Sequence, residues 1–288
     1  MVVNCLSIDV EGFVESNLQS LGWDPQCLDN IADHYEIESN TDCVLEILND
    51  MGVKGTFFFV GRLAAEIPNM IRKVAELGHE VACHSYMHLR IPGSAKDEFR
   101  RKLDAAKKQL EGVSRQEVLG FRAPEFSIIA SSLWALDILN ELGFAYDSSV
   151  YPIGFHDVYG ISGASTSIHK LSNGLIEFPM ATISILGKRF PFGGGGYFRL
   201  YPLFVTKWCL DHVNREGNSC MLYMHPYELG PIVPTLSGLS SYRRFRHYYN
   251  CGNAGRRLPE LLRAFRFAPA IDILRYKGCL EGNSCLTS

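Results

Sequence analysis

Two histidines lie four residues apart in the stretch EVACHSYMHLR, at residues 80–90 of a chain that has nine histidines in all. Side chains four residues apart face the same way on a helical turn, and a loop that winds back can also bring them together. His84 and His88 could therefore hold one metal ion. The alternative is a coincidence on a polar loop, because the HxxxH spacing alone is weak evidence.

Residues that can carry a charge or a proton also follow the other apolar runs of the chain. In order along the sequence these residues are Asp9, Glu11, His84, His88, Arg122, Asp147 and His225. In parallel α/β folds the carboxyl ends of the strands meet at one rim, where functional groups collect. We therefore expect all of these side chains at one rim of the fold.

One carboxylate and two imidazoles form a three-ligand metal site that leaves positions open for water and substrate. This donor set suits a catalytic zinc or a similar divalent ion. Such an ion acidifies a bound water and polarises a carbonyl. Of the acidic pair Asp9 and Glu11, one residue can hold the metal while the other takes a proton from the water, or one of them can simply cap the next segment.

The remaining candidates each have two interpretations. Arg122 can pair with the catalytic base and set its pKa and orientation, or it can form a structural salt bridge. His225 suits a general acid that protonates a leaving amine, and the alternative is a buried histidine with satisfied hydrogen bonds. Asp147 can orient that histidine or cap a turn before Ser148.

The elements that must position these residues alternate between strand and helix through the first 150 residues. Apolar runs at 2–9, 53–61, 79–84, 117–122 and 144–149 predict strands, and the segments 40–52, 68–78, 96–112 and 131–143 predict helices. This alternation indicates a parallel sheet covered by helices. Beyond it we expect a strand over 175–186, a flexible turn at 193–196, a helix over 200–217, a strand over 219–225 and a frayed tail in the last ten residues.

Composition limits the class of protein. The chain has 288 residues, of which 47% are hydrophobic and 20% charged, and its net charge is −3. These values are typical of a globular protein with one large domain, and they disfavour nucleic-acid binding. The basic segment 242–250 could contact an anion such as a phosphate or an acidic sugar, or it could be a solvated face.

Cysteine usage and hydropathy bear on location. The nine cysteines include no CxxC pair, and several lie in apolar runs, which favours a reducing compartment. The sequence shows no leader pattern and no apolar span long enough to cross a bilayer. We expect a cytoplasmic protein, with association at the inner face of a membrane left open.

With these residues assembled, the chain resembles the polysaccharide deacetylases, the NodB-homology group of carbohydrate esterases. The motifs that carry the resemblance occur in order: SIDVE (7–11), HSYMH (84–88), FRAPEFS (121–127), YDSS (146–149) and MHPYE (224–228). Three further stretches, IESNTD (37–42), GGGGYFRLYP (193–202) and RFRHYYN (244–250), are similar to the exosortase-associated exopolysaccharide deacetylases, in which a C-terminal segment follows the deacetylase core.

The resemblance implies a distorted (β/α) barrel of about seven parallel strands over residues 1–230, with a C-terminal extension over 231–288 packed on the same domain. It implies one divalent metal ion, zinc above all, held by Glu11, His84 and His88. Asp9 would be the catalytic base, tuned by Arg122. His225 would be the general acid, with Asp147 as its partner.

The function that the resemblance implies is removal of the N-acetyl group from an N-acetylhexosamine of a cell-surface glycan, an exopolysaccharide or its lipid-linked precursor. Many members of the family have two adjacent aspartates in the first motif, whereas this chain has Asp-x-Glu at positions 9–11, a variant that also occurs where the substrate is not a sugar. One alternative is therefore an allantoinase-like hydrolase of cyclic amides, and another is an inactive glycan-binding barrel. The basic C-terminal segment could meet an anionic lipid carrier or a partner subunit.

Overall fold

The computed structural model describes residues 2–21, 34–154, 159–236, 239–282 and 286. Its strands are β1 Val3–Val10, β2 Thr56–Phe59, β3 Glu80–Cys83, β4 Gly120–Phe121, β5 Tyr146–Asp147, β6 His169–Lys170, β7 Ile176–Glu177, β8 Thr182–Ile185, β9 Lys188–Pro191, β10 Met221–Met224 and β11 Arg266–Phe267. Its α-helices are α1 Phe13–Leu21, α2 His34–Asp50, α3 Leu63–Glu66, α4 Pro68–Glu76, α5 Lys96–Ser114, α6 Trp134–Glu141, α7 Gly195–Leu200, α8 Leu203–Arg215, α9 Pro226–Leu229, α10 Ser241–Tyr248, α11 Ala254–Ala264 and α12 Ala270–Tyr276.

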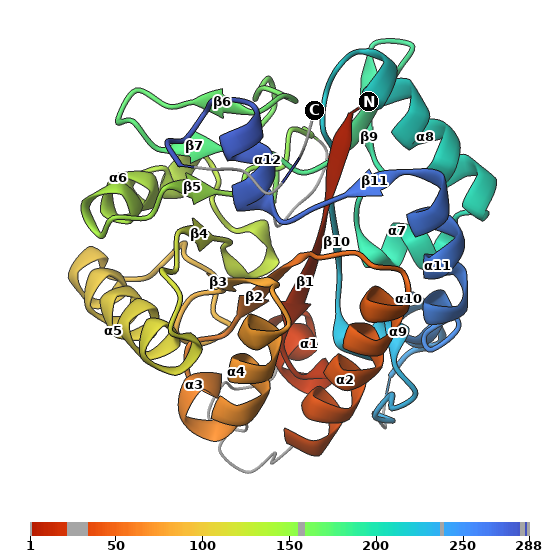
Figure 1. The fold of residues 1–288 in the computed structure, drawn as a ribbon, viewed down its shortest axis with the longest axis horizontal. Helices are drawn as coiled ribbons and strands as arrows, with labels where there is room; N and C mark the ends of the chain where they lie inside the picture. Colours follow the sequence, from red (N-terminus) through yellow and green to blue (C-terminus); the bar gives the residue numbers. More distant parts are fainter. Residues whose placement is uncertain (1, 22–33, 155–158, 237–238, 283–285, 287–288) are drawn as a thin grey trace.

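One curled sheet forms the centre of the molecule, with helices around it (Figure 1). The strand order is β10-β1-β2-β3-β4-β5-β7-β6, and every pair from β10 to β7 is parallel. A parallel bridge between Met180, just after β7, and Met221 of β10 joins the two sides of the curl. The expected fold class, a parallel α/β barrel, is confirmed.

The alternation of side chains along the strands builds two cores. In β2, Phe57 and Phe59 belong to the cluster beneath the surrounding helices, whereas Phe58 belongs to a second cluster inside the barrel. Successive residues of a strand point to opposite faces, so both faces of a strand must be apolar when both are covered. All eight residues of β1 are buried for this reason.

The covering helices form because their apolar residues recur at helical spacing. In α5, Phe99, Leu103, Ala106 and Leu110 are buried, and they repeat every three or four residues along one side. Asp97 lies in the first turn, where its negative charge interacts favourably with the helix dipole. This helix packs against α4 and β3 and supports the strand that precedes the two histidines.

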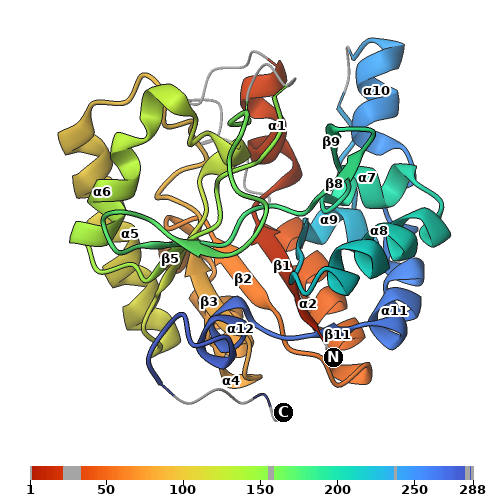
Figure 2. The same ribbon diagram turned by 90° about the horizontal axis from the view of Figure 1, so that it is seen from above.

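The two ends of the barrel differ, and α12 covers the end where the strands begin (Figure 2). The backbone N–H of Ala270 donates to Thr56 Oγ1 over 2.8 Å, and that of Ile271 donates to Glu80 Oε2 over 3.1 Å. Thr56 and Glu80 are the first residues of β2 and β3. The site must therefore lie at the opposite end, where α1 follows β1.

Two local expectations are wrong. The segment 193–196 is no flexible turn, because Gly194 caps α7 and Gly195 begins it. A Cβ atom on Gly195 would lie 1.7 Å from Glu228 Oε2, so glycine is required here by close packing. The segment 175–186 is not one strand, since it contains β7 and part of a separate hairpin formed by β8 and β9.

The C-terminal region joins the same sheet, since β10 and β11 both pair with β1 in parallel. The limits of 1–230 and 231–288 for the barrel and its extension stay a prediction. Part of the expected frayed tail, residues 283–285 and 287–288, lies outside the described residues.

Within the part of the chain that is described, no helix combines the length and apolarity that crossing a bilayer requires. The cytoplasmic location stays a prediction.

Candidate active site

The structure brings the predicted metal ligands together at the carboxyl ends of the strands. Glu11 follows β1 and His84 follows β3, and the loop after β3 turns back to bring His88 beside them. Ser85 permits this turn with a left-handed backbone (φ +66°). One possible ligand atom from each of Glu11, His84 and His88 lies within 4.8 Å of the others, and all three residues are buried.

The donor atoms of this cluster fit a divalent cation. His84 Nδ1 lies 2.9 Å from the carbonyl oxygen of Arg122, and a carbonyl only accepts, so Nδ1 carries a hydrogen. In the neutral ring the lone pair is then on Nε2, which faces Glu11 Oε2 at 3.5 Å. Oε2 is buried and makes no aligned hydrogen bond with the described residues, although His88 Nε2 lies 2.7 Å away. Lone pairs that converge in this way suit a shared cation.

Arg122 holds Asp9 beside this cluster. Its Nη1 lies 2.5 Å from Asp9 Oδ1 and also donates to Ser7 Oγ over 2.7 Å, while its Nε donates to the carbonyl oxygen of Ser148. The guanidinium lies 4.1 Å from the centre of the Phe58 ring. The charge of Asp9 is thus compensated and its orientation fixed, as the first interpretation of Arg122 requires.

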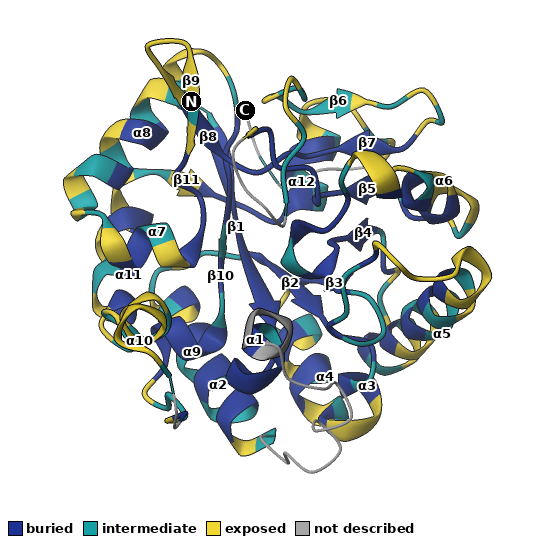
Figure 3. Cartoon of the chain, turned by 180° about the vertical axis from the view of Figure 1, so that it is seen from behind, coloured by how far each residue is buried: buried dark blue, intermediate teal, exposed yellow. Residues whose placement is uncertain are grey.

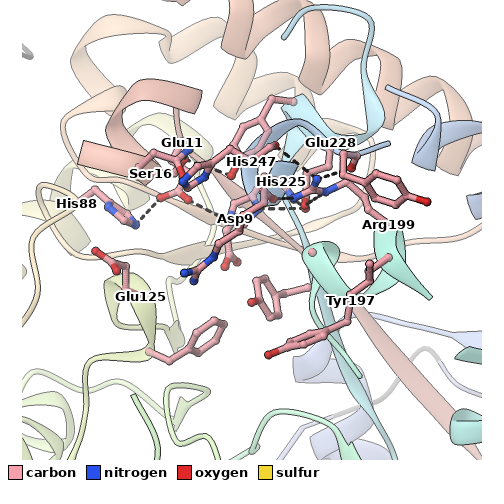
Figure 4. A pocket seen from close by; sticks show the side chains of 18 of the residues that line it. Asp9, Glu11, Ser16, His88, Glu125, Tyr197, Arg199, His225, Glu228 and His247 are labelled. Atoms are coloured by element: carbon pink, nitrogen blue, oxygen red, sulfur yellow. Dashed lines mark hydrogen bonds and ion pairs between the residues drawn. The ribbon is translucent and has the colours of Figure 1, made fainter. Parts of the chain in front are cut away.

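His225 directly follows β10, which pairs with β1 on the side away from β2 and β3, and it reaches the same cluster from there. Its Nε2 lies 3.0 Å from Glu11 Oε1, and its Nδ1 lies 3.1 Å from Glu228 Oε2 (Figure 4). Arg199 Nε donates to the other carboxylate oxygen of Glu228 over 2.7 Å. A chain of charged groups therefore runs from Arg199 through Glu228 and His225 to Glu11.

The pKa values follow from these contacts. Burial disfavours the charge of Glu11, but the surrounding His88, His225 and His84 hold its pKa well below the usual range. Burial lowers the pKa of His225, and the hydrogen bonds to Glu11 and Glu228 outweigh it and raise the value to about 10. Burial raises the pKa of Glu228, whereas Arg199 and His225 lower it to about 2.

Of the two interpretations of Asp147, the contacts in the structure fit the cap of a turn and not a partner of His225. Its carboxylate accepts from Ser149 Oγ over 2.6 Å and from the Ser149 backbone N–H over 3.1 Å. It also interacts with Glu177 of β7, and burial raises the pKa of both carboxyl groups. Glu228 contacts His225 in its place, because α9 turns directly after β10 and returns its third residue to the histidine.

Two residues of the site are harder to find from the sequence. Glu228 has a local signal, since a glutamate three residues after His225 in HPYE can form a capping box with it. Arg199 has no such signal, because it comes from α7 and meets Glu228 only in the folded chain.

A cavity of about 590 Å³ opens above these residues. Asp9, Glu11, His84, His88 and His225 line its floor together with aromatic side chains. Tyr197 and Arg199 reach it from α7, and His247 from α10 (Figure 4). Figure 3 shows that β1, β2 and β3 are buried throughout, whereas α10 is largely exposed. This volume is in the range of pockets that enclose small organic ligands.

Two family models match the chain in succession. The polysaccharide deacetylase model matches residues 27–146, and a domain of unknown function, DUF3473, matches residues 148–275. The segment 27–146 thus matches the polysaccharide deacetylase family. Glu11 and Asp9 precede the first match, and His225, Glu228 and Arg199 lie in the second, so the site spans both segments. The likeness to the exosortase-associated subgroup stays a prediction.

Curated relatives share part of their length with the chain. A chitooligosaccharide deacetylase of Azorhizobium caulinodans is 34% identical over 106 residues, which are 36% of this chain and 49% of the relative. A peptidoglycan-N-acetylglucosamine deacetylase of Bacillus cereus is 29% identical over 98 residues, which are 34% of this chain and 36% of the relative. The chain thus spans less than half of each.

Solved structures match over nearly the whole chain. A crystal structure assigned to a polysaccharide deacetylase of Mycobacterium smegmatis covers 99% of this chain and 93% of its own, with a TM-score of 0.61 and 21% identity. The crystal structure of Puue allantoinase covers 97% and 92%, with a TM-score of 0.64 and 14% identity. At these identities the likeness shows the fold.

Proposed function

We propose that this chain is a metal-dependent amide hydrolase that removes the N-acetyl group from an N-acetylhexosamine of a cell-surface glycan, an exopolysaccharide or its lipid-linked precursor. The observation that carries the proposal is the convergence of the Glu11, His84 and His88 cluster with Asp9 and His225 in one cavity. The family match and the names of the two curated relatives support a deacetylase.

In this proposal Glu11, His84 and His88 hold a divalent ion, for which zinc fits the donor set. When bound, such an ion polarises a carbonyl and makes water more acidic. Asp9 accepts a proton from the attacking water, and Arg122 donates to this carboxylate and fixes its orientation. Water adds its oxygen to the acetyl carbon and the carbon–nitrogen bond breaks, which yields acetate and a free amine.

His225 is placed to give a proton to the departing nitrogen. Its ring borders the cavity beside the metal cluster, while Glu228 accepts from Nδ1 and fixes the orientation of the ring. Asp9 and His225 approach the cluster from different strands, β1 and β10, so the base and the acid are separate groups. This division suits the hydrolysis of an amide, because the attacking water must lose a proton and the departing amine must gain one.

The first test combines metal content with acetate release. We would measure bound zinc and the acetate released from N-acetylated chitooligosaccharides and peptidoglycan fragments by the wild type, His84→Ala and His212→Ala. His212 is the control because it is half exposed, in α8, and outside the cavity. We expect about one zinc per chain and acetate release in the wild type and the control, both lost in His84→Ala.

Two outcomes would contradict the proposal. If the wild type binds no metal even when zinc is added, the metal-dependent mechanism fails. If a parallel panel of cyclic ureides is opened while no acetylated sugar releases acetate, the activity is that of a cyclic amide hydrolase on the same fold.

A further inference from the structure

Helix α10 carries aromatic side chains that the protein itself does not cover. None of the helix's residues is buried, and Tyr242 and Phe245 are 71% and 51% exposed. Tyr249, directly after the helix, is 44% exposed, and its ring centre lies 4.8 Å from that of Phe245. Single exposed aromatic residues are common, whereas a group on one helix face marks a binding surface.

These rings belong to the cavity of the candidate active site. Tyr242, Phe245 and Tyr249 line the same 590 Å³ space as Asp9 and His84. The space is in the range of pockets for drug-sized ligands, which are larger than a single hexosamine ring. A substrate that reaches the metal cluster with one sugar thus has room to place its neighbouring sugars along α10.

The helix is fixed in this position from both ends. At its start, the Ser240 side chain accepts from the backbone N–H of Arg243. At its end, Arg199 Nη1 donates to the carbonyl oxygens of Tyr249 and His247, over 2.6 and 3.4 Å. Because Arg199 also holds Glu228, one guanidinium sets both the position of α10 and the partner of His225.

The chemistry of this wall suits carbohydrate. A pyranose presents faces of C–H groups, which pack on aromatic rings, and a rim of hydroxyls, which need donors and acceptors. Arg246, which follows Phe245 in the sequence, also lines the cavity, and its side chain forms no ion pair with any described residue. The exposed rings can pack on the C–H faces of a sugar, and the guanidinium of Arg246 can donate to its hydroxyls.

We propose that Tyr242, Phe245 and Tyr249 on and after α10 form a subsite for the sugar units next to the one that is deacetylated. The substrate is then an oligosaccharide or polysaccharide chain, and a free N-acetylhexosamine is a poor substrate. This inference rests on the proposed function. It assigns a substrate-binding role to part of the segment that matches the domain of unknown function, residues 148–275.

The experiment compares substrates of increasing length. We would measure kcat/KM for acetate release from N-acetylchitooligosaccharides of one to six sugar units, for the wild type, Phe245→Ala and Trp208→Ala. Trp208 is the matched control, since it is 50% exposed, lies in α8 and does not line the cavity. We expect kcat/KM to rise with length in the wild type and the control. In Phe245→Ala the ratio of longest to shortest should fall about tenfold, mainly through KM.

An unchanged ratio in Phe245→Ala, or a wild-type rate that does not depend on length, would overturn the subsite. Absence of acetate release at every length would instead count against the proposed function. The subsite is then tested by calorimetric titration of the same proteins with the six-sugar chain. Weaker binding by Phe245→Ala than by Trp208→Ala would support the subsite, and equal binding or none would overturn it.

Discussion

Two buried arginine–carboxylate pairs stand beside the candidate active site, one in each half of the chain. Arg122 Nη1 lies 2.5 Å from Asp9 Oδ1, and Arg199 Nε lies 2.7 Å from Glu228 Oε1. In the first pair the arginine is enclosed, because Arg122 is 0% exposed and also bonds to Ser7 and to the carbonyl of Ser148, and Asp9 alone lines the cavity. The second borders the cavity, where Arg199 is 7% exposed.

This difference in exposure, together with the other contacts of each arginine, indicates what each pair does. The Arg122 pair fixes a carboxylate that itself lines the cavity, and its other contacts go to Ser7 of β1 and to the carbonyl of Ser148, just after β5. The Arg199 pair fixes a carboxylate that acts through His225, and its other contacts go to the carbonyls at the end of α10. The enclosed pair should therefore matter most for folding, and the open pair for the proton donor and the substrate chain.

The largest effect should come from Arg122→Met. This change leaves Asp9 buried without a counterion, and we expect a loss of about 3–5 kcal/mol in the free energy of unfolding. Arg199→Met is the comparison, and we expect about 1–3 kcal/mol because Glu228 keeps its hydrogen bond with His225 when Arg199 is removed. Urea unfolding followed by circular dichroism measures both. Equal losses of unfolding free energy in the two variants would show that the deeper burial of Arg122 makes no difference to stability.

Asp9→Asn should reduce deacetylation more than any change in the Glu228 pair. A proton acceptor is removed, so we expect kcat to fall about 10²–10⁴-fold. Zinc content should stay at the wild-type level, since Glu11, His84 and His88 form the metal cluster without Asp9. Steady-state kinetics with metal analysis on the same preparation checks this. Loss of zinc in Asp9→Asn would make Asp9 a ligand rather than the base.

Glu228→Gln should have a smaller effect on the reaction. The side chain keeps an oxygen for His225 but loses the charge that orients its ring, and we expect about a 10–100-fold decrease in kcat with little change in KM. Asp147→Asn is the control, because Asp147 contacts Ser149 and Glu177 instead of His225. A decrease in Asp147→Asn as large as that in Glu228→Gln would restore Asp147 as a partner of the acid.

The smallest effect concerns a carboxylate pair that has no arginine bound between its members. Burial and the neighbouring Asp147 raise the pKa of Glu177 well above its ordinary value of 4.5. The folded state therefore keeps a proton that the unfolded state releases, so the contribution of Glu177 to stability is fully present at acid pH and is lost as the pH rises. Glu177→Gln should reduce this loss as the pH rises from about 4.5 toward neutrality. Unfolding curves across this range would contradict the idea if the wild type and the variant showed the same slope.

Much of the barrel and most of the site could be predicted from local sequence. Strand and helix signals alternate clearly through the first 150 residues, and the residues after each apolar run had to share a rim because parallel strands point the same way. The structure departs from this prediction at 193–196, where glycines look like a flexible turn. Their small size instead allows α7 to pack against Glu228, which no local pattern reveals.

The sequence by itself determined the order of the elements, the alternation of their faces and the set of residues at the carboxyl rim. These properties depend on neighbours a few positions apart. Only the tertiary structure decided that Asp147 contacts Ser149 and Glu177 instead of His225, that Arg199 holds Glu228, and that α10 borders the cavity. The physical reason is that the contacts of Arg199 with Glu228 and with the Tyr249 carbonyl join residues 29 and 50 positions apart, whose meeting depends on how the sheet curls and how the helices pack on it.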